Sequence, residues 1–200
     1  YPQVVSQWIS EPDKGLYDAM NKGIKMCTGD YVGILNSDDT FFSNDTIEKV
    51  AVFFQNHHGL DAIIGNIGQH QNGKIVRRYS SKNWTPEKLK IGFMPPHPSI
   101  FFKRDLFKKL GYYTLGYKIA SDYELIIRYF LKNKIKSQYS GITTTSMLVG
   151  GASSSGLESY KTITKEIGKA FEENRIAYST FKVKYRIFWK FLDYLKAWIS

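Results

Sequence analysis

Hydrophobic and polar positions follow two different periods at the start of the chain. Residues 4–9 form a short apolar-rich run between polar turns, which predicts a β-strand. Residues 16–27 repeat apolar side chains three and four positions apart, which predicts an α-helix with a core-facing side that includes Leu16 and Cys27. Residues 31–35 are apolar throughout and predict a buried strand. The chain therefore begins as strand, helix and strand.

The rest of the chain continues to alternate between the two patterns. Further helices are expected over residues 45–54, 85–91, 104–110 and 122–133, and further strands over residues 61–67, 74–79, 99–103 and 136–145. Glycine and serine dominate residues 150–156, and amphipathic helical patterns follow them. The sequence thus predicts a mixed α/β domain over residues 1–151 and a helical tail over residues 152–200.

Four consecutive polar residues end the third of these apolar runs. They are Asn36, Ser37, Asp38 and Asp39. Ligand crevices of open α/β sheets lie at the carboxyl ends of the strands, and adjacent carboxylates suit Mg²⁺ or Mn²⁺ that carries a phosphate. A turn that only reverses the chain uses the same residue types, so both interpretations stay open from these residues alone.

Several motifs stand in a fixed order around this polar stretch. E-x-D-x-G-x-Y-D-A-M-N-K-G occupies residues 11–23, T-G-D-Y and N-S-D-D follow at residues 28–31 and 36–39, and His97-Pro98-Ser99 and Ala120-Ser121-Asp122-Tyr123-Glu124-Leu125 come later. Together they closely resemble family-2 glycosyltransferases with the GT-A fold, over roughly residues 4–151.

The resemblance implies both a fold and an activity. The fold is α/β, with a Rossmann-like mixed sheet flanked by helices. The activity is the transfer of a sugar from a nucleotide-diphosphate donor to a saccharide or lipid-linked acceptor, as in polysaccharide biosynthesis. The resemblance also implies an inverting single displacement that depends on a divalent metal, Mn²⁺ or Mg²⁺.

The resemblance places the polar stretch beside the donor. Asp38 and Asp39 are expected to bind the metal, which offsets the negative charge that develops on the leaving diphosphate. Asn36 takes the position where many relatives have the first acid of an Asp-x-Asp motif. It is expected, with Asp38, on the cofactor and nucleotide side, and which carboxylate touches metal and which binds ribose stays open.

Three residues of the first motif are assigned in the same way. Asp13, Asp18 and Asn21 are expected to line the nucleotide side of the cleft, by resemblance. The alternative for Asp18 and Asn21 is that they only solvate the exposed face of the predicted helix.

Asp122 is the expected general base, because the matching acid in the family lies near the acceptor hydroxyl. The alternative is a structural acid that the helix N-terminus stabilises, with a depressed pKa. His97 follows two prolines that fix its backbone and is expected on the acceptor side, with a satisfied, partly buried histidine as the alternative. The tyrosine-rich segment 111–120 is expected either to line the sugar as a wall or lid or to pack as a surface loop.

Composition narrows the partners only slightly. The 200 residues are 42% hydrophobic, enough for a real core, and carry 28 Lys and Arg against 18 Asp and Glu, a net charge of +10. This balance favours anionic partners such as nucleotide sugars or acidic lipids, and nucleic acid is not expected because no supporting motif is present. Cys27, the single cysteine, is expected to be a buried thiol in a reducing compartment.

The ends of the chain carry two further expectations. No signal peptide or membrane-spanning run is visible, so a cytoplasmic location is expected. Residues 181–199 combine aromatic and basic side chains at helical spacing, which fits peripheral contact with the inner face of the cell membrane. Packing of this segment on the domain or on another subunit is the alternative.

The family normally opens with two strands and a helix that have no counterpart here. The predicted sheet is therefore N-terminally incomplete, and exposed apolar edges are expected where those strands would pair. The alternative function is accordingly a truncated, non-catalytic remnant that binds a glycan or a partner subunit.

Overall fold

The computed structural model describes residues 5–149, 157–186 and 188. The α-helices are α1 (Leu16–Met26), α2 (Thr46–Asn56), α3 (Arg104–Leu110), α4 (Ser121–Ile126), α5 (Leu157–Asn174) and α6 (Thr180–Lys184); η1 (Pro86–Ile91) and η2 (His97–Ser99) are 3-10 helices and η3 (Ile127–Lys132) is a π-helix. The strands are β1 (Tyr31–Gly33), β2 (Thr40–Phe41), β3 (Ala62–Gln71), β4 (Lys74–Tyr79), β5 (Ile100–Lys103) and β6 (Ser137–Leu148). Every element predicted between residues 16 and 145 is present, with ends that differ by a few residues, and β2 is an additional strand.

The strands of the described chain form one mixed sheet in the order β1-β5-β3-β6-β2. The long strand β3 pairs antiparallel with β5 over residues 62–64 and antiparallel with β4 over residues 67–71. Its other edge pairs with β6, and this pairing is parallel. The mixed α/β fold predicted from the sequence is therefore confirmed.

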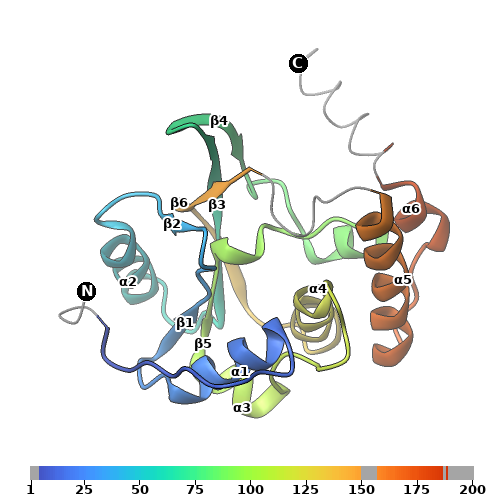
Figure 1. Cartoon of the computed structure of the whole chain (residues 1–200), viewed down its shortest axis with the longest axis horizontal. Coiled ribbons are helices and arrows are strands. Elements are labelled where there is room, and N and C mark those ends of the chain that lie inside the picture. The colour runs from blue at the N-terminus through green and yellow to red at the C-terminus, as the bar shows by residue number, and fades with distance from the viewer. Residues whose placement is uncertain (1–4, 150–156, 187, 189–200) are drawn as a thin grey trace.

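The sheet separates two hydrophobic clusters, with α2 on one side and α4 and α5 on the other (Figure 1). Val50 and Phe54 of α2 pack on Ile63 and Phe101. Ile64, the next residue of β3, belongs to the larger cluster, whose other members come mainly from α1, β5, α3, α4, η3 and α5. Successive residues of β3 thus face opposite clusters, as the pleat of a strand buried on both sides requires.

Residues 5–9 do not form the predicted strand. Val5, Trp8 and Ile9 are 52%, 79% and 50% exposed, and none of the described strands pairs with this segment. Apolar side chains in an extended run favour a strand only where a neighbouring strand forms hydrogen bonds with its backbone N–H and C=O groups. The described part of the sheet offers no such neighbour to this run.

The buried face of α1 is rotated from the predicted one, with which it shares Ile24 and the partly buried Met20. Its buried residues are Tyr17, Asn21 and Ile24, which are four and three positions apart, whereas Leu16 is 60% exposed. The helix is turned so that Tyr17 and Asn21 reach hydrogen-bond partners inside the fold. Cys27 follows the helix and is exposed, so the prediction of a buried thiol is wrong.

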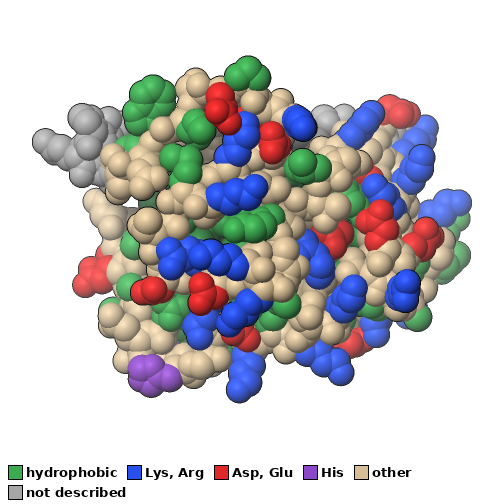
Figure 2. Space-filling view, turned by 90° about the horizontal axis from the view of Figure 1, so that it is seen from below, with side chains coloured by type: hydrophobic (Ala, Val, Ile, Leu, Met, Phe, Trp, Pro, Cys, Tyr) green, Lys and Arg blue, Asp and Glu red, His purple; other side chains and the backbone are tan. Residues whose placement is uncertain are grey.

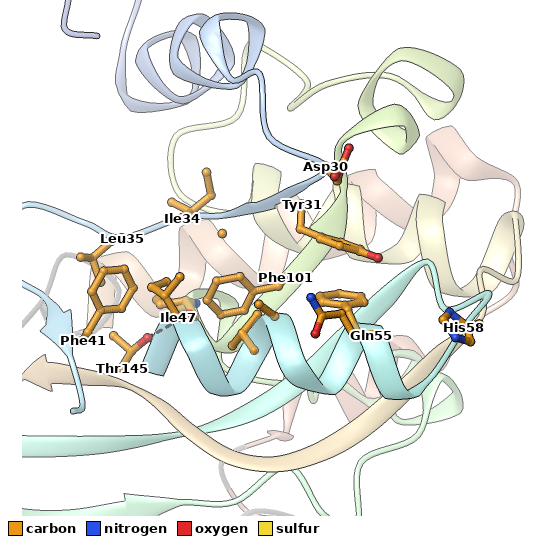
Figure 3. Close-up of a pocket in the computed structure, with 15 residues that line it drawn as sticks. Asp30, Tyr31, Ile34, Leu35, Phe41, Ile47, Gln55, His58, Phe101 and Thr145 are labelled. Carbon is orange, nitrogen blue, oxygen red and sulfur yellow. Dashed lines mark hydrogen bonds between the residues drawn. The ribbon is translucent and has the colours of Figure 1, made fainter. Parts of the chain in front are cut away.

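β1 is an edge strand rather than the buried strand predicted. It pairs with β5 on one side, and none of the described strands pairs with its other side. A cavity of about 610 Å³ lies beside it, between β1, α2 and Phe101 of β5. Figure 3 shows Leu35, Phe41 and Ile47 at one end of this cavity, and these side chains are 40%, 44% and 49% exposed. Apolar side chains beside β1 are therefore partly open to solvent, and the exposed apolar strand edge stays a prediction.

α5 packs beside α4 (Figure 1). Its residues Ile167, Ala170 and Phe171 belong to the larger hydrophobic cluster of the sheet domain. The first helix after residue 151 thus shares the core of the preceding domain, and the division into domain and tail stays a prediction. The predicted flexible break at 150–156 and most of the predicted interfacial helix lie outside the described residues.

Candidate active site

The polar stretch after β1 forms a turn in which Asn36 orients Asp39. The Asn36 amide Nδ2 donates to Asp39 Oδ2 at 2.8 Å, and the Asp39 N–H donates to the Asn36 carbonyl at 3.1 Å. Asp39 is 7% exposed, whereas Asp38 faces solvent. Burial raises the pKa of Asp39, the Asn36 amide opposes this rise, Asp38 adds to it and His70 opposes it. A cation at this turn would offset the cost of ionising the buried carboxyl.

β6 joins this turn to the segment that carries His97. Thr40, directly after the turn, pairs with Ser146 of β6. The neighbouring Thr145 donates through Oγ1 to the carbonyl of Pro98 at 2.9 Å. Pro98 follows His97 within η2, so the acidic turn and His97 are attached to the same strand.

Asp122 lies in the first turn of α4 with a raised pKa. Its Oδ1 accepts from the Tyr123 N–H at 2.8 Å and from the Tyr17 hydroxyl at 3.5 Å. Burial raises the pKa of Asp122 to about 6, although the Tyr123 N–H and Tyr17 hydroxyl oppose this rise. The depressed pKa considered for a helix-end acid is thus wrong, because burial outweighs the helix N-terminus. A carboxylate with this pKa is ionised at neutral pH and basic enough to take a proton.

Tyr113, which interacts electrostatically with Asp122, contacts three of the motif residues: Tyr17, Asn21 and His97. Its ring stacks on Tyr17 with centroids 5.6 Å apart, and its hydroxyl lies 2.5 Å from His97 Nε2. Its backbone is paired with the side chain of Asn21, whose Nδ2 donates to the Tyr113 carbonyl at 2.8 Å and whose Oδ1 accepts from the Tyr113 N–H at 2.9 Å. Burial raises the pKa of Tyr113, and its interaction with the Asp122 carboxylate raises this pKa further.

These contacts change how His97 and Asn21 are interpreted. His97 is 8% exposed, and burial lowers its pKa to about 4, so it is neutral at physiological pH. It acts here as a hydrogen-bonding group that is fixed by Tyr113, not as a cation. Asn21 is 7% exposed and uses both ends of its amide on the Tyr113 backbone, so it does not solvate an exposed helix face.

Asp13 and Asp18 meet around one lysine at the start of α1. Lys22 Nζ lies 2.7 Å from Glu11 Oε1, 2.7 Å from Asp13 Oδ1 and 3.7 Å from Asp18 Oδ2. The Lys14 N–H donates to Asp18 at 3.0 Å and is the largest cause of the lowered pKa of that carboxyl. The three acids and Lys22 therefore form a cluster of ion pairs at the protein surface, and the contact of Asp13 and Asp18 with a nucleotide stays a prediction.

Segment 111–120 is hydrogen-bonded to side chains of η3 and α4. Arg128 of η3 donates to the carbonyls of Gly111 and Tyr112 at 2.8 and 2.7 Å. Glu124 of α4 accepts from the Thr114 hydroxyl at 2.8 Å and pairs with Arg128. Hydrogen bonds of this number favour a fixed segment rather than a mobile lid, and its contact with a sugar stays a prediction.

Tyr17 and Tyr113 are two residues near Asp122 that the sequence alone did not single out. Tyr17 stands inside the first motif, four positions before Asn21, so both point to the same side of α1. A pair of polar side chains at that spacing, within a buried face, is the signal that would have identified Tyr17. Tyr113 has no comparable local signal, because its partners are distant in the sequence.

A mixed sheet with an acidic turn after one strand and an acid at the start of a helix is characteristic of GT-A-like glycosyltransferase folds. The family model described as Glycosyl transferase family 2 matches residues 8–122, which is more than half of the chain. The chain belongs to this family.

Relatives and solved structures agree with this assignment. A PGL/p-HBAD biosynthesis glycosyltransferase of Mycobacterium tuberculosis is 29% identical over 140 residues, which cover 68% of this chain and 52% of that protein. An uncharacterized glycosyltransferase of the same species is 33% identical over 129 residues, 60% of this chain and 46% of that protein. The crystal structure of S. aureus TarS in complex with UDP-GlcNAc superposes with a TM-score of 0.57 at 19% identity, over 82% of this chain and 48% of that one. The chain thus spans about half the length of the curated relatives it matches.

The described surface adds two observations. In the part of the chain that is described, no helix is long and apolar enough to cross a bilayer. Figure 2 shows basic and acidic side chains interspersed on the face seen from below, rather than a patch of one sign. That face therefore lacks the continuous basic stripe typical of nucleic-acid binding.

Proposed function

We propose that this protein transfers a sugar from a nucleotide-diphosphate donor to a hydroxyl of a saccharide or lipid-linked acceptor, with inversion at the anomeric carbon. The observation that carries the proposal is the Asp122 carboxyl, whose pKa is raised to about 6 and which the Tyr17 hydroxyl contacts. The family supplies the reaction class. The UDP-GlcNAc bound by TarS supports a nucleotide sugar as the donor.

Asp122 is the general base in this proposal. Its carboxylate takes the proton of the acceptor hydroxyl while the acceptor oxygen forms a bond to the anomeric carbon. The bond between that carbon and the diphosphate oxygen breaks, and its electron pair leaves with the diphosphate. The raised pKa of Asp122 favours the proton transfer, which typically contributes 10²–10⁴-fold to such rates.

Asp38 and Asp39 are proposed to hold a divalent metal together with the donor diphosphate. Their oxygen donors suit Mg²⁺ or Mn²⁺, and the buried Asp39 carboxyl gains from a nearby cation. The described residues contain no group of three or more His, Cys, Asp or Glu side chains that could hold a metal alone. Metal and nucleotide are therefore expected to bind together, with the metal offsetting charge on the leaving group.

The remaining motif residues are proposed to shape the two sides of the site. Asn36 orients Asp39, and Asp13 and Asp18 contribute to the nucleotide side around Lys22. Asn21 acts through the Tyr113 backbone. His97 faces the acceptor as a neutral hydrogen-bonding group that is held by Tyr113.

Thermal unfolding followed by circular dichroism tests the donor site. UDP or GDP is added with and without Mn²⁺ to the wild type, Asp38→Asn, Asp39→Asn and the control Asp105→Asn, which removes an exposed acid from α3. A ligand at 100 times its Kd stabilises the native state by about 2.7 kcal/mol. We expect metal-dependent stabilisation in the wild type and Asp105→Asn, and its loss in the other two variants.

Two outcomes would contradict this assignment. If nucleotide stabilises the protein equally with and without Mn²⁺, and equally in both variants, Asp38 and Asp39 are not part of the donor site. A wild type that melts cooperatively without responding to any nucleotide would favour the alternative of a non-catalytic binding module.

Asp122→Asn tests the proposed base. This variant is expected to keep its stabilisation by nucleotide, whereas its rate of UDP release from UDP-GlcNAc is expected to fall by about 10²–10⁴-fold.

Peripheral membrane contact is proposed for α6 and the described residues that follow it. Phe181, Tyr185 and Phe188 are 63%, 46% and 54% exposed, and Lys182 and Lys184 lie between them. Aromatic and basic side chains together favour an anionic lipid surface. The wild type is expected to sediment with phosphatidylglycerol vesicles, and a smaller fraction of Phe181→Ser is expected to do so. Equal fractions of both proteins in the pellet would contradict the membrane contact.

A further inference from the structure

Glu166 of α5 accepts hydrogen bonds from three backbone N–H groups directly before α4, the helix that carries Asp122. Its Oε1 accepts from the Lys118 N–H at 2.6 Å, and its Oε2 accepts from the N–H groups of Ile119 and Ala120 at 3.0 and 2.9 Å. Glu166 is 9% exposed. A buried carboxylate with three backbone donors on its two oxygens is held in one orientation.

Tyr17 also forms a hydrogen bond with residues 118–120, through the carbonyl of Ile119. The Ile119 N–H donates to Glu166, whereas the carbonyl of Ile119 accepts from the Tyr17 hydroxyl. The same hydroxyl lies 3.5 Å from Asp122 Oδ1. Ala120, the last residue that Glu166 holds, is the N-cap of α4, and Asp122 follows two positions later. Glu166 therefore fixes both the start of α4 and the residue that anchors Tyr17.

Glu166 also acts on Asp122 through its charge. The charged and titratable groups that face Asp122 are Tyr17 of α1, Tyr113 of segment 111–120 and Glu166 of α5, together with the neighbouring Tyr123 of α4. Among the causes of the raised pKa of Asp122, burial is the largest, and the negative charge of Glu166 raises it further. The residue thus affects both the geometry and the basicity of Asp122.

We propose that Glu166 is a positioning residue for the general base, so that α5 is part of the active site of this glycosyltransferase. The inference rests on the proposed role of Asp122. Glu166 lies 44 residues beyond the end of the family match at residue 122, and nothing in the motifs points to it. It acts through the backbone of residues 118–120 and through Tyr17, without touching the substrate.

Three proteins test the proposal by NMR: the wild type, Glu166→Gln and Glu172→Gln. Glu172 lies on the same helix and is exposed, so its variant removes the same charge without touching residues 118–120. The side-chain carboxyl carbon of Asp122 is titrated, with its signal assigned by Asp122→Asn. The wild-type midpoint is expected near pH 6, and a lower midpoint is expected for Glu166→Gln only.

Amide hydrogen exchange at residues 118–120 is measured in the same samples. Glu166→Gln presents an NH₂ group to backbone donors, so these amides are expected to exchange at least about tenfold faster than in the wild type. Glu172→Gln is expected to match the wild type in both measurements. If the exchange rates rise but the Asp122 midpoint stays unchanged, Glu166 only supports the fold and the positioning role is wrong. If the amides of residues 118–120 exchange at the wild-type rate in Glu166→Gln, Glu166 does not hold these amides and the proposal is wrong.

Turnover separates this proposal from the proposed function. Glu166→Gln is expected to lower kcat for UDP release from UDP-GlcNAc by roughly tenfold or more, with KM nearly unchanged, because a displaced base slows chemistry without weakening donor binding. If Asp122→Asn retains full turnover, the role of Asp122 fails, whereas the NMR results still decide whether Glu166 positions it. A fall in kcat for Glu172→Gln equal to that for Glu166→Gln would overturn the assignment to Glu166.

Discussion

Asp122→Asn is expected to stabilise the protein at neutral pH. The ordinary pKa of 3.8 is raised to about 6 in the folded chain, which corresponds to about 3 kcal/mol when the carboxyl is ionised. Because the side chain keeps some contact with water, about 2 to 3 kcal/mol is the expected gain. Asparagine has nearly the same shape, carries no charge and still accepts the Tyr123 N–H. The residue that we propose as the base thus lowers the stability of the fold when it is ionised.

The pH dependence gives this prediction its sign. Between about pH 4 and pH 6 the folded state holds a proton on Asp122 that the unfolded state has lost, so stability falls as pH rises through this window. Above pH 6 the full penalty is present, and below pH 4 it disappears because both states are protonated. The gain from Asp122→Asn is therefore expected at pH 7.5 and is expected to vanish near pH 4.

Urea unfolding of the two proteins at both pH values provides the measurement. His97, whose pKa is lowered to about 4 by burial, reduces stability as pH falls below about 6.5, but it does so in both proteins. The difference between the proteins therefore isolates Asp122. A variant that is less stable at pH 7.5, or a difference that is the same at both pH values, would refute the argument that burial opposes ionisation of this carboxyl.

Other predictions concern the packing around the site. Asn21→Ala is expected to lower the free energy of unfolding by about 2 to 4 kcal/mol in urea, because it leaves the buried N–H and C=O of Tyr113 without their partners; an unchanged stability would mean that water replaces the amide. Gly65→Ala is expected to destabilise by about 1 to 3 kcal/mol, since a Cβ there would lie 2.7 Å from the backbone oxygen of Ile142. The control Gly23→Ala, in the exposed interior of α1 with nothing within 4 Å, is expected to stabilise by up to about 1 kcal/mol, and equal effects of the two alanines would contradict the steric argument.

Local sequence patterns were sufficient for elements that depend on local contacts. The spans of α1 and α3 follow from apolar spacing, and β4 follows from its position after a glycine turn. The strand predicted over residues 4–9 is absent from the described residues 5–9. A strand depends on a partner that lies elsewhere in the fold, and no sequence pattern within the segment reports whether that partner is there. The same limit explains why β1, predicted as buried, is an edge strand.

The candidate site divides in the same way. Asp38, Asp39 and Asp122 stand in motifs and could be named from the sequence, although their roles stay predictions. The pKa of Asp122 could not be derived, because helix position alone favours a depressed value and the opposing burial comes from distant segments. The role of Glu166 was the least predictable from the sequence, because its three backbone donors are 46 to 48 residues away in the chain.

The cavity beside β1 decides how unfolding of this protein has to be observed. Its walls include Leu35, Phe41 and Ile47, which are partly open to solvent in the native state. Dyes that fluoresce in apolar surroundings, such as ANS, are therefore expected to bind the folded protein. A dye-based melting curve would begin bright, and a ligand that displaced the dye would imitate a change in stability. Circular dichroism and calorimetry avoid this artefact because they detect the polypeptide itself.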